Sequence, residues 1–315
     1  MGKQSDKQKI VVLIGPTAVG KTKLSIELAK RLNAEIISGD SMQIYRGMDI
    51  GTAKITVEEM EGVPHHLIDI KTPDESFSVA EFQERVRKLI KDIANRGKLP
   101  MIVGGTGLYI QSVIYDYQFT DAASNPTYRR ELEQMIEEQG IEPLLQKLAE
   151  VDPESANRIH PNNPRRVIRA LEIYHTTGQT MTTYLENQQN DLLYDVALIG
   201  LTMDRSHLYE RINQRVDIMI GAGLVEEVQA LHKRGLKDCQ SIQAIGYKEL
   251  YSYLNKQIDL EVAVEQIKQS SRRYAKRQLT WFRNKMDVTW FDVTNRTLYQ
   301  TLDEILKYIA GKLQI

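Results

Sequence analysis

Eight residues near the start of the chain have the spacing of a phosphate-binding loop. Residues 15–22 read G-P-T-A-V-G-K-T, which fits the pattern GxxxxGK[ST]. In such a loop the backbone N–H groups at a helix start converge on an anion, the lysine adds a positive charge, and the last hydroxyl can bind Mg²⁺. We therefore predict a di- or triphosphate site formed by Gly15, Pro16, Thr17, Ala18, Val19, Gly20, Lys21 and Thr22, with Thr22 as the Mg²⁺ ligand.

A carboxylate follows the apolar run at residues 34–38, which predicts a second strand ending just before Asp40. In a doubly wound parallel sheet, the carboxyl ends of the strands face the same crevice as the phosphate loop. Asp40 could cap the next turn, bind Mg²⁺ or act as a general base. The pattern alone leaves these three roles open.

Residues 99–107 read L-P-M-I-V-G-G-T-G, at the strand where an ATPase usually carries a Walker-B aspartate. This strand ends in glycines and the hydroxyl of Thr106 instead of a carboxylate. Glycines allow the backbone to come close to a ligand, and Thr106 can then donate a hydrogen bond. The pattern argues against an ordinary ATPase, although a small kinase remains compatible with it.

The segment 268–285 concentrates positive charge and contains no acidic residue. Its basic residues are Lys268, Arg272, Arg273, Lys276, Arg277, Arg283 and Lys285, interleaved with Tyr274, Trp281 and Phe282. Arginine and lysine neutralise RNA phosphates and aromatic rings stack on unpaired bases, so the composition suits an RNA surface. A solvated helix face with core aromatics explains the pattern equally well. A second basic cluster, Arg165, Arg166 and Arg169, opens another predicted helix.

Three further groups have competing interpretations. Arg211 and Arg215 are four residues apart on a predicted helix, and either lie on the surface or bind a diphosphate. The adjacent pair His65 and His66 invites a metal site, but neighbouring residues on a strand point to opposite faces, so structural roles are favoured. The single cysteine, Cys239, excludes an intramolecular disulfide and a cysteine zinc site, and we expect it to be buried.

Composition bounds the class of protein. The 315 residues carry a net charge of −1, with 42% hydrophobic and 26% charged residues, enough for one large core or two smaller ones. No apolar run approaches the ~20 residues that cross a bilayer, and no signal peptide is recognisable. We therefore expect a cytoplasmic protein without membrane contact, whose nucleic-acid surface, if present, is local.

The order of the predicted elements indicates an α/β fold. Strands are predicted at 10–15, 34–38, 66–70, 101–104 and 196–201, and helices at 21–32, 79–95, 128–139, 142–150 and 164–174, with mostly helix after residue 201. This pattern predicts a P-loop, nucleotide-kinase-like parallel sheet core made by residues 1–115 and 195–315. Residues 116–194 form a helical insertion.

Several longer motifs together resemble the tRNA dimethylallyltransferases, also called tRNA isopentenyltransferases, of the bacterial type. The matching segments are GPTAVGKT at 15–22, ISGDSMQIY at 37–45, GTAK at 51–54, VPHHLID at 63–69, GGTGLY at 104–109, NPRRVIRALEIY at 163–174, IGYKEL at 245–250 and YAKRQLTWFR at 274–283. They run in the family's order over nearly the whole chain. The zinc-finger extension of eukaryotic relatives is missing, in agreement with the single cysteine.

The resemblance implies transfer of a dimethylallyl group from dimethylallyl diphosphate to the exocyclic amine of adenosine 37 in tRNA. The phosphate loop would then hold the diphosphate leaving group, together with Arg211, Arg215 and Mg²⁺. By the same resemblance, Asp40 is the general base that takes the amine proton, and Thr106 aligns the reacting groups. The target base must leave its stack to reach the site.

The resemblance also implies which residues contact the anticodon stem-loop. They are Asp40, Ser41, Met42, Gln43 and Thr106 near the site, Arg165, Arg166, Val167, Ile168 and Arg169 on the insertion, and Arg272, Arg273, Lys276 and Arg277 near the C-terminus. We expect the enzyme to act as a monomer. The alternatives are a free-nucleotide isopentenyltransferase, a phosphate-loop kinase and a non-catalytic RNA-binding protein, all of which fit fewer of these features.

Overall fold

The computed structural model describes residues 7–119, 125–188 and 191–315, and the chain divides into two compact units. The first unit contains residues 1–114 and 192–315, and the second contains residues 115–191. The predicted insertion was placed at residues 116–194, within a few residues of this division. Each unit has its own hydrophobic core.

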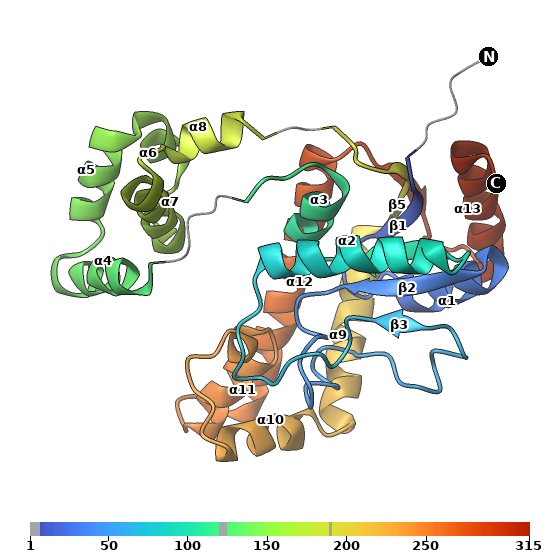
Figure 1. The fold of residues 1–315 in the computed structure, drawn as a ribbon. Coiled ribbons are helices and arrows are strands. Elements are labelled where there is room, and N and C mark those ends of the chain that lie inside the picture. Colours follow the sequence, from blue (N-terminus) through green and yellow to red (C-terminus); the bar gives the residue numbers. More distant parts are fainter. Residues whose placement is uncertain (1–6, 120–124, 189–190) are drawn as a thin grey trace. The chain divides into compact units, whose positions relative to one another are not determined.

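A six-stranded parallel sheet forms the centre of the first unit (Figure 1). Its strands are β1 (Lys9–Ile14), β2 (Ala34–Gly39), β3 (His65–His66), β4 (Leu99–Gly104), β5 (Asp195–Thr202) and β6 (Thr289–Asp292), in the spatial order β3-β2-β4-β1-β5-β6. After β1, the chain forms β2, β3 and β4 on one side of β1 within the sheet, and later forms β5 and β6 on its other side. The carboxyl end of β1 therefore lies at a topological switch point, where ligands bind in open α/β sheets.

Two strands differ from the prediction. β3 is confined to residues 65–66 because Leu67 and Asp69 have φ angles of 63° and 54°, which end the extended backbone. The short edge strand β6, parallel to β5, was not predicted within the mostly helical C-terminal part. The other predicted strands are confirmed to within two residues at each end.

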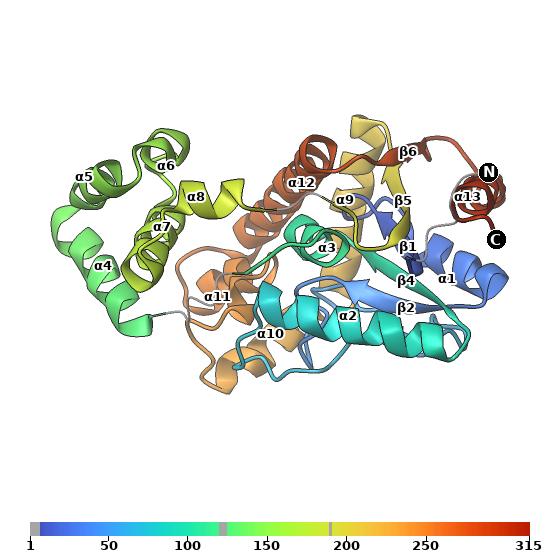
Figure 2. The same cartoon turned by 45° about the horizontal axis from the view of Figure 1, so that its top comes forward.

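Helices cover both faces of the sheet. The helices α1 (Lys21–Leu32) and α13 (Leu298–Leu313) pack on one face, and α2 (Val79–Asn95) and α3 (Gly107–Ile114) on the other (Figure 1 and Figure 2). Leu24 and Leu28 of α1 are fully buried against the strands, as their spacing predicts. α1 begins after Gly20 and ends at Asn33, whose φ of 50° is left-handed.

A group of helices follows β5 and lies beside the carboxyl ends of the strands (Figure 1). It consists of α9 (Arg205–Gly221), α10 (Leu224–Lys233), the 3₁₀ turn η1 (Ser241–Gln243), α11 (Tyr247–Leu254) and α12 (Leu260–Lys285). α12 packs against α9, α11 and α3. The basic segment 268–285 is therefore the C-terminal 18 of the 26 residues of one long helix.

The second unit is entirely helical in its described residues. Its helices are α4 (Pro126–Gln139), α5 (Glu142–Val151), α6 (Pro153–Arg158), α7 (Pro164–Thr177) and α8 (Met181–Glu186). The side chains of Asn125 and Asn163 cap α4 and α7, and each is followed by proline at the first helical position. Leu132, Leu144 and Leu148 are buried in its core.

Two expectations about the whole chain can be compared with the structure. No helix in the described residues is both long enough and apolar enough to span a bilayer. Cys239 was expected to be buried, which is wrong: it is partly exposed in the connection before η1, where its thiol contacts the Lys237 carbonyl at 3.2 Å.

Candidate active site

The phosphate loop lies between β1 and α1 and has a conformation that demands particular residues. A Cβ atom on Gly15 would lie 2.8 Å from the Leu201 carbonyl oxygen of β5, so only glycine fits there. Ala18 and Gly20 have φ angles of 64° and 108°. These left-handed residues turn the chain tightly at the start of α1, which is the conformation that gathers N–H groups around an anion.

Lys21 is the charged residue of this loop. Its ammonium group donates to the carbonyl oxygens of Gly15 and Pro16, at 2.9 and 2.8 Å. Burial, assisted by the positive charge of Arg215, lowers the pKa of Lys21 from 10.5 to about 7. A lysine with so low a pKa lacks a full anionic partner, and a diphosphate would supply one.

Arginines of α9 complete the phosphate side of the site. A cavity of about 290 Å³ is lined by Ala18, Gly20, Lys21, Thr22, Arg211, Gln214, Arg215 and Ile218. Burial lowers the pKa of the Arg215 guanidinium, and the negative charge of Asp40 offsets part of this effect. The structure thus brings Arg211 and Arg215 to the phosphate loop. This position agrees with the interpretation that they bind a diphosphate.

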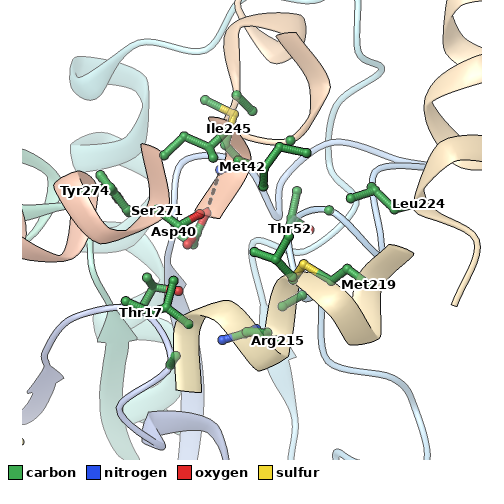
Figure 3. Close-up of a pocket in the computed structure, with 18 of the residues that line it drawn as sticks. Thr17, Asp40, Met42, Thr52, Arg215, Met219, Leu224, Ile245, Ser271 and Tyr274 are labelled. Carbon is green, nitrogen blue, oxygen red and sulfur yellow. Dashed lines mark hydrogen bonds between the residues drawn. The ribbon is translucent and has the colours of Figure 1, made fainter. Parts of the chain in front are cut away.

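A second cavity, of about 340 Å³, adjoins the first, and both are lined by Ala18 and Arg215. One side of it is polar, with Thr17, Asp40, Ser271 and Tyr274. Its apolar lining includes Met219 and Leu224 on the opposite side and Ile245 beside Met42 (Figure 3). A volume of this size with a few convergent polar groups is typical of a small-molecule site.

Asp40 both caps a turn and faces this cavity. Its Oδ1 accepts hydrogen bonds from the backbone N–H groups of Met42 and Gln43, at 2.8 and 3.4 Å (Figure 3). Among the described residues, none donates a hydrogen bond to its second oxygen, Oδ2. One oxygen therefore fixes the orientation of the carboxylate, and the other is available for a proton.

Thr106 contacts Ser41, the residue that follows Asp40 in the chain. Its hydroxyl donates to the Ser41 hydroxyl at 3.4 Å, and its backbone N–H donates to the Gly39 carbonyl at 3.4 Å. The turn that carries Thr106 is thus attached to the end of β2. The structure brings Asp40, Ser41 and Thr106 together, as expected.

The neighbouring glycines serve a different purpose from the predicted one. A Cβ atom on Gly104 would lie 2.3 Å from the Gly39 carbonyl oxygen, one on Gly105 2.1 Å from the Gln278 amide nitrogen, and one on Gly107 2.2 Å from the Trp281 ring. These glycines make room for β2 and α12, and the expectation that they accommodate a ligand is wrong.

Gln43 and Met42 differ in their availability to RNA. The Gln43 side chain accepts a hydrogen bond from the Ser38 hydroxyl at 3.1 Å and donates to the carbonyls of Thr52 and Ala53, each at 3.4 Å. It therefore already has protein partners on both sides. Met42 lines the larger cavity and is directly accessible from it (Figure 3).

The basic residues of α12 separate into two groups. Lys268 forms ion pairs with Asp217 and Glu265, Arg272 donates to the Asn213 side chain at 2.5 Å, and Arg283 lies over the Trp290 ring. Arg273, Lys276, Arg277 and Lys285 are exposed without these partners, and Arg283 is exposed as well as lying over Trp290. Arg277 also lines the larger cavity and lies 5.8 Å from the centre of the Tyr274 ring.

The aromatic residues of this helix are mainly structural. Phe282 is fully buried and offers no ring face for base stacking, so that expectation is wrong for Phe282, whereas Trp281 is partly buried and packs against Gly107. Tyr274 points into the cavity (Figure 3). Its burial, with the nearby charge of Asp40, raises the pKa of the phenol to about 12.

The cluster on α7 also combines exposed and buried residues. Arg165 and Arg166 are exposed, whereas Arg169 pairs with the buried carboxylate of Glu172 at 2.7 Å. Val167 and Ile168 are only 0% and 5% exposed within the core of the second unit. Those two residues can reach RNA through their backbone alone, so the side-chain contribution of this cluster falls to its arginines.

The histidine pair has the structural role that was favoured. His65 Nδ1 lies 2.8 Å from the Val63 carbonyl, and His66 Nε2 lies 2.8 Å from the Glu35 carboxylate. Burial lowers the pKa of His65. In the part of the chain that the structure describes, no group of three or more His, Cys, Asp or Glu residues is arranged to hold a metal.

Two residues that shape the cavity escaped sequence analysis. Gln278 of α12 donates and accepts hydrogen bonds with two different loops. Glu227 of α10 accepts hydrogen bonds from the N–H groups of residues 49–51, which precede the cavity residues Thr52 and Ala53. A polar residue on the buried face of a basic helix could have revealed Gln278. Nothing local marks Glu227, because these N–H groups are more than 170 residues away in the sequence.

Comparison with known proteins decides the family. The family model described as IPP transferase matches residues 43–285. A tRNA dimethylallyltransferase of Bacillus cereus strain Q1 is 69% identical over 309 residues, covering 98% of this chain and 96% of the relative. The chain belongs to the tRNA dimethylallyltransferase family. A tRNA dimethylallyltransferase of Bacillus anthracis, 68% identical over 98% of both chains, supports the same assignment.

Solved structures of tRNA dimethylallyltransferases share the fold. The full-length tRNA isopentenylpyrophosphate transferase of Bacillus halodurans has a TM-score of 0.75 and 56% identity, with 98% of this chain and 97% of that chain covered. A eukaryotic dimethylallyltransferase acting on tRNA has a TM-score of 0.78 and 32% identity, with 91% and 74% covered. The resemblance inferred from the motifs and the predicted α/β fold class are both confirmed.

Proposed function

We propose that this chain transfers the dimethylallyl group of dimethylallyl diphosphate to the exocyclic amine of adenosine 37 in tRNA. The observation that carries the proposal is the junction of two cavities at Arg215. One holds Lys21 of the phosphate loop, and the other holds the Asp40 carboxylate. An electrophile anchored by its diphosphate can therefore meet a nucleophile beside a base. We also propose that the enzyme acts in the cytoplasm, where its tRNA substrate is found, and that it acts as a monomer.

The diphosphate is held at the phosphate loop. Cleavage of the carbon–oxygen bond leaves an electron pair on the diphosphate, and positive groups lower the energy of that charge. Lys21 and Arg215 line the same cavity and supply two of these groups, and Arg211 at its exposed edge supplies a third. The N–H groups at the start of α1 add the partial positive charge of a helix N-terminus.

The adenine amine is activated at Asp40. As the N6 atom forms its bond to the prenyl carbon, the amine loses a proton, and the Oδ2 atom of Asp40 accepts it. The Oδ1 atom stays hydrogen-bonded to the backbone of Met42, so the carboxylate does not rotate away. Thr106 is not among the residues that line the cavity, and we propose that it orients the base through its contact with Ser41, which does line it.

The donor set at the phosphate loop fits Mg²⁺. The Thr22 hydroxyl, a hard oxygen ligand, lies in the same cavity as Lys21 and Arg215. Mg²⁺ commonly takes few protein ligands and keeps water and phosphate oxygens around it. We therefore propose that Thr22 holds the ion, which, when bound, neutralises charge on the diphosphate.

Each unit carries exposed basic residues of its own. In the first unit, Arg273, Lys276 and Arg277 are exposed on α12, and Arg277 also reaches the cavity. In the second unit, Arg165 and Arg166 are exposed at the start of α7. We propose that these arginines and lysines bind the phosphates of the anticodon stem-loop while adenosine 37 leaves its stack and enters the larger cavity.

The proposal is tested by the choice of acceptor. Labelled dimethylallyl diphosphate is incubated with the enzyme and either unmodified tRNA or AMP. We expect label on tRNA and none on AMP. Label on AMP alone would identify a free-nucleotide isopentenyltransferase. Consumption of ATP without prenyl transfer would identify a kinase.

A further inference from the structure

The side chain of Gln278 connects two loops of the site that are distant in the sequence. Its Oε1 accepts the backbone N–H of Thr17 in the phosphate loop at 2.9 Å, and its Nε2 donates to the carbonyl of Gly105 at 2.9 Å. Gln278 is only 6% exposed. The N–H of Thr17 therefore points at α12 and is not among the amides left for the diphosphate.

Each of the two loops carries a residue of the site. Thr17 lines the cavity that contains Asp40, and Gly105 immediately precedes Thr106 (Figure 3). The fit is close, because a Cβ atom on Gly105 would lie 2.1 Å from the Gln278 amide nitrogen. The position of Gln278 consequently sets the distance between the phosphate loop and the Thr106 turn.

The chemistry requires an amide at this position. Thr17 offers a donor and Gly105 offers an acceptor, so the partner must accept on one side and donate on the other. Glutamine meets both demands in one orientation. An ionised carboxylate accepts only, and a methionine of similar length does neither.

The geometry points to Gln278 as a positioning residue that aligns the diphosphate site with the acceptor site. This inference rests on the proposed transfer reaction, and it assigns the residue no contact with the substrates. Gln278 acts through Thr17 and Gly105. Its loss should therefore reduce the rate of transfer more than it weakens the binding of either substrate.

The variant Gln278→Glu provides the sharpest test. Burial and the adjacent Gly105 carbonyl raise the pKa of the introduced carboxyl group, which can donate to Gly105 only when it is protonated. Single-turnover rates are measured from pH 6 to pH 9 and divided by the wild-type rate at each pH. We expect a loss of about 10- to 100-fold at high pH, the effect of one buried unsatisfied group, and recovery toward pH 6.

Two further variants separate the possible causes of a rate loss in Gln278→Glu. Gln269→Glu makes the same chemical change at an exposed position of α12, so it measures the effect of added negative charge on tRNA binding. It should keep a rate close to that of the wild type at every pH. Gln278→Met should be slow at every pH, with substrate dissociation constants changed less than the rate.

A measurement without substrates tests the contact itself. Amide hydrogen exchange of peptides covering residues 15–22 should become faster in Gln278→Met than in the wild type, because the Thr17 N–H loses its acceptor. If the wild-type enzyme transferred no prenyl group, the proposed function would fail while this result still tested the contact. Unchanged exchange, or a Gln278→Glu rate within about threefold of wild type at every pH, would overturn the inference. A rate loss independent of pH, accompanied by equal loss of substrate affinity, would also overturn it.

Discussion

At the scale of single residues, the Asp40 carboxylate combines a capping role with the proton-accepting role that we propose for it. From the sequence, capping, Mg²⁺ binding and proton transfer are alternative roles for Asp40, but in the structure Oδ1 caps the turn at Met42 while Oδ2 stays available. Capping is useful to a general base, because it holds the second oxygen in one direction. The distinction between the two readings could not be made from the sequence, since both require the same residue at the same place.

We expect Asp40→Asn to slow prenyl transfer by ~10²–10⁴-fold, the usual cost of losing a general base. The asparagine oxygen can still accept the Met42 N–H, so the turn should persist. Single-turnover rates at saturating tRNA measure the effect, and the affinity for dimethylallyl diphosphate should stay near that of the wild type. A loss of less than about tenfold would exclude Asp40 as the base.

Lys21 leads to a prediction about pH. Because its pKa is about 7 in the free protein, binding of a diphosphate should raise that pKa and draw a proton from solution. Calorimetry at pH 8 in buffers of different ionisation enthalpy should show uptake of about one more proton in the wild type than in Lys21→Met. Lys23→Met, at an exposed position two residues later, should behave like the wild type. Equal uptake in all three would mean that Lys21 is already charged before binding.

The same shift makes a prediction for stability without ligand. Between about pH 7 and pH 10.5, the folded protein holds fewer protons at Lys21 than the unfolded chain does. The penalty for burying this charge is therefore complete below pH 7 and disappears as the pH rises toward 10.5. The Tm of the wild type, relative to that of Lys21→Met, should rise over this interval. A difference in Tm that stays constant with pH would contradict the lowered pKa.

At the scale of elements, helix α12 shows how a basic pattern divides between folding and binding. The sequence pattern predicted either an RNA surface or a solvated face with core aromatics, and the structure contains parts of both. Phe282 is core and Lys268 is neutralised by two acidic residues, whereas Arg273 and Lys276 are exposed. A count of basic residues cannot distinguish these groups, because partners such as Asp217 come from another helix.

This division sharpens the test of RNA binding. The double substitution of Arg273 and Lys276 by Gln should weaken tRNA binding and flatten its salt dependence, reducing the log–log slope by ~0.7–0.9 for each lost phosphate contact. Affinity for dimethylallyl diphosphate should remain unchanged. The matched control replaces Lys307 and Lys312, exposed on α13, by Gln and should leave the slope unaltered. Equal slopes for both double variants would mean that α12 does not bind the tRNA backbone.

The predicted elements succeeded where hydrophobic periodicity was strong. α1, α2 and the four interior strands β1, β2, β4 and β5 were placed closely, because their buried faces repeat over many residues. β6 was missed because a four-residue edge strand has too few buried positions to give a pattern. β3 was drawn too long because nothing in its composition indicates the left-handed angle of Leu67.

At the scale of the whole molecule, the site residues come from segments of the first unit that are far apart in the sequence. Thr17, Asp40, Arg215 and Tyr274 line one cavity, although they follow or belong to β1, β2, α9 and α12. The parallel sheet brings the first two together at the carboxyl ends of its strands, as predicted. The helices after β5 complete the wall, and their packing could not be derived from local sequence.

The second unit has its own core and contains the family motif NPRRVIRALEIY at residues 163–174. Its exposed Arg165 and Arg166 are available for phosphate contacts, while Arg169 and Arg129 both bind Glu172. Arg169 of the basic cluster therefore has a structural role, because it neutralises the buried Glu172 carboxylate. The motif alone gave no sign of this, since Arg129 lies on another helix.

The central claim is the identity of the acceptor atom, and mass spectrometry of the reacted RNA tests it most directly. An unmodified anticodon stem-loop with adenosine at position 37 is incubated with dimethylallyl diphosphate, Mg²⁺ and the enzyme, then digested to nucleosides. We expect the mass of one C5H8 unit on the adenosine from position 37, with diphosphate released in equal amount. A matched stem-loop with guanosine at that position should gain nothing. The added mass on any other nucleoside, or an equal amount of it on both stem-loops, would contradict the assignment.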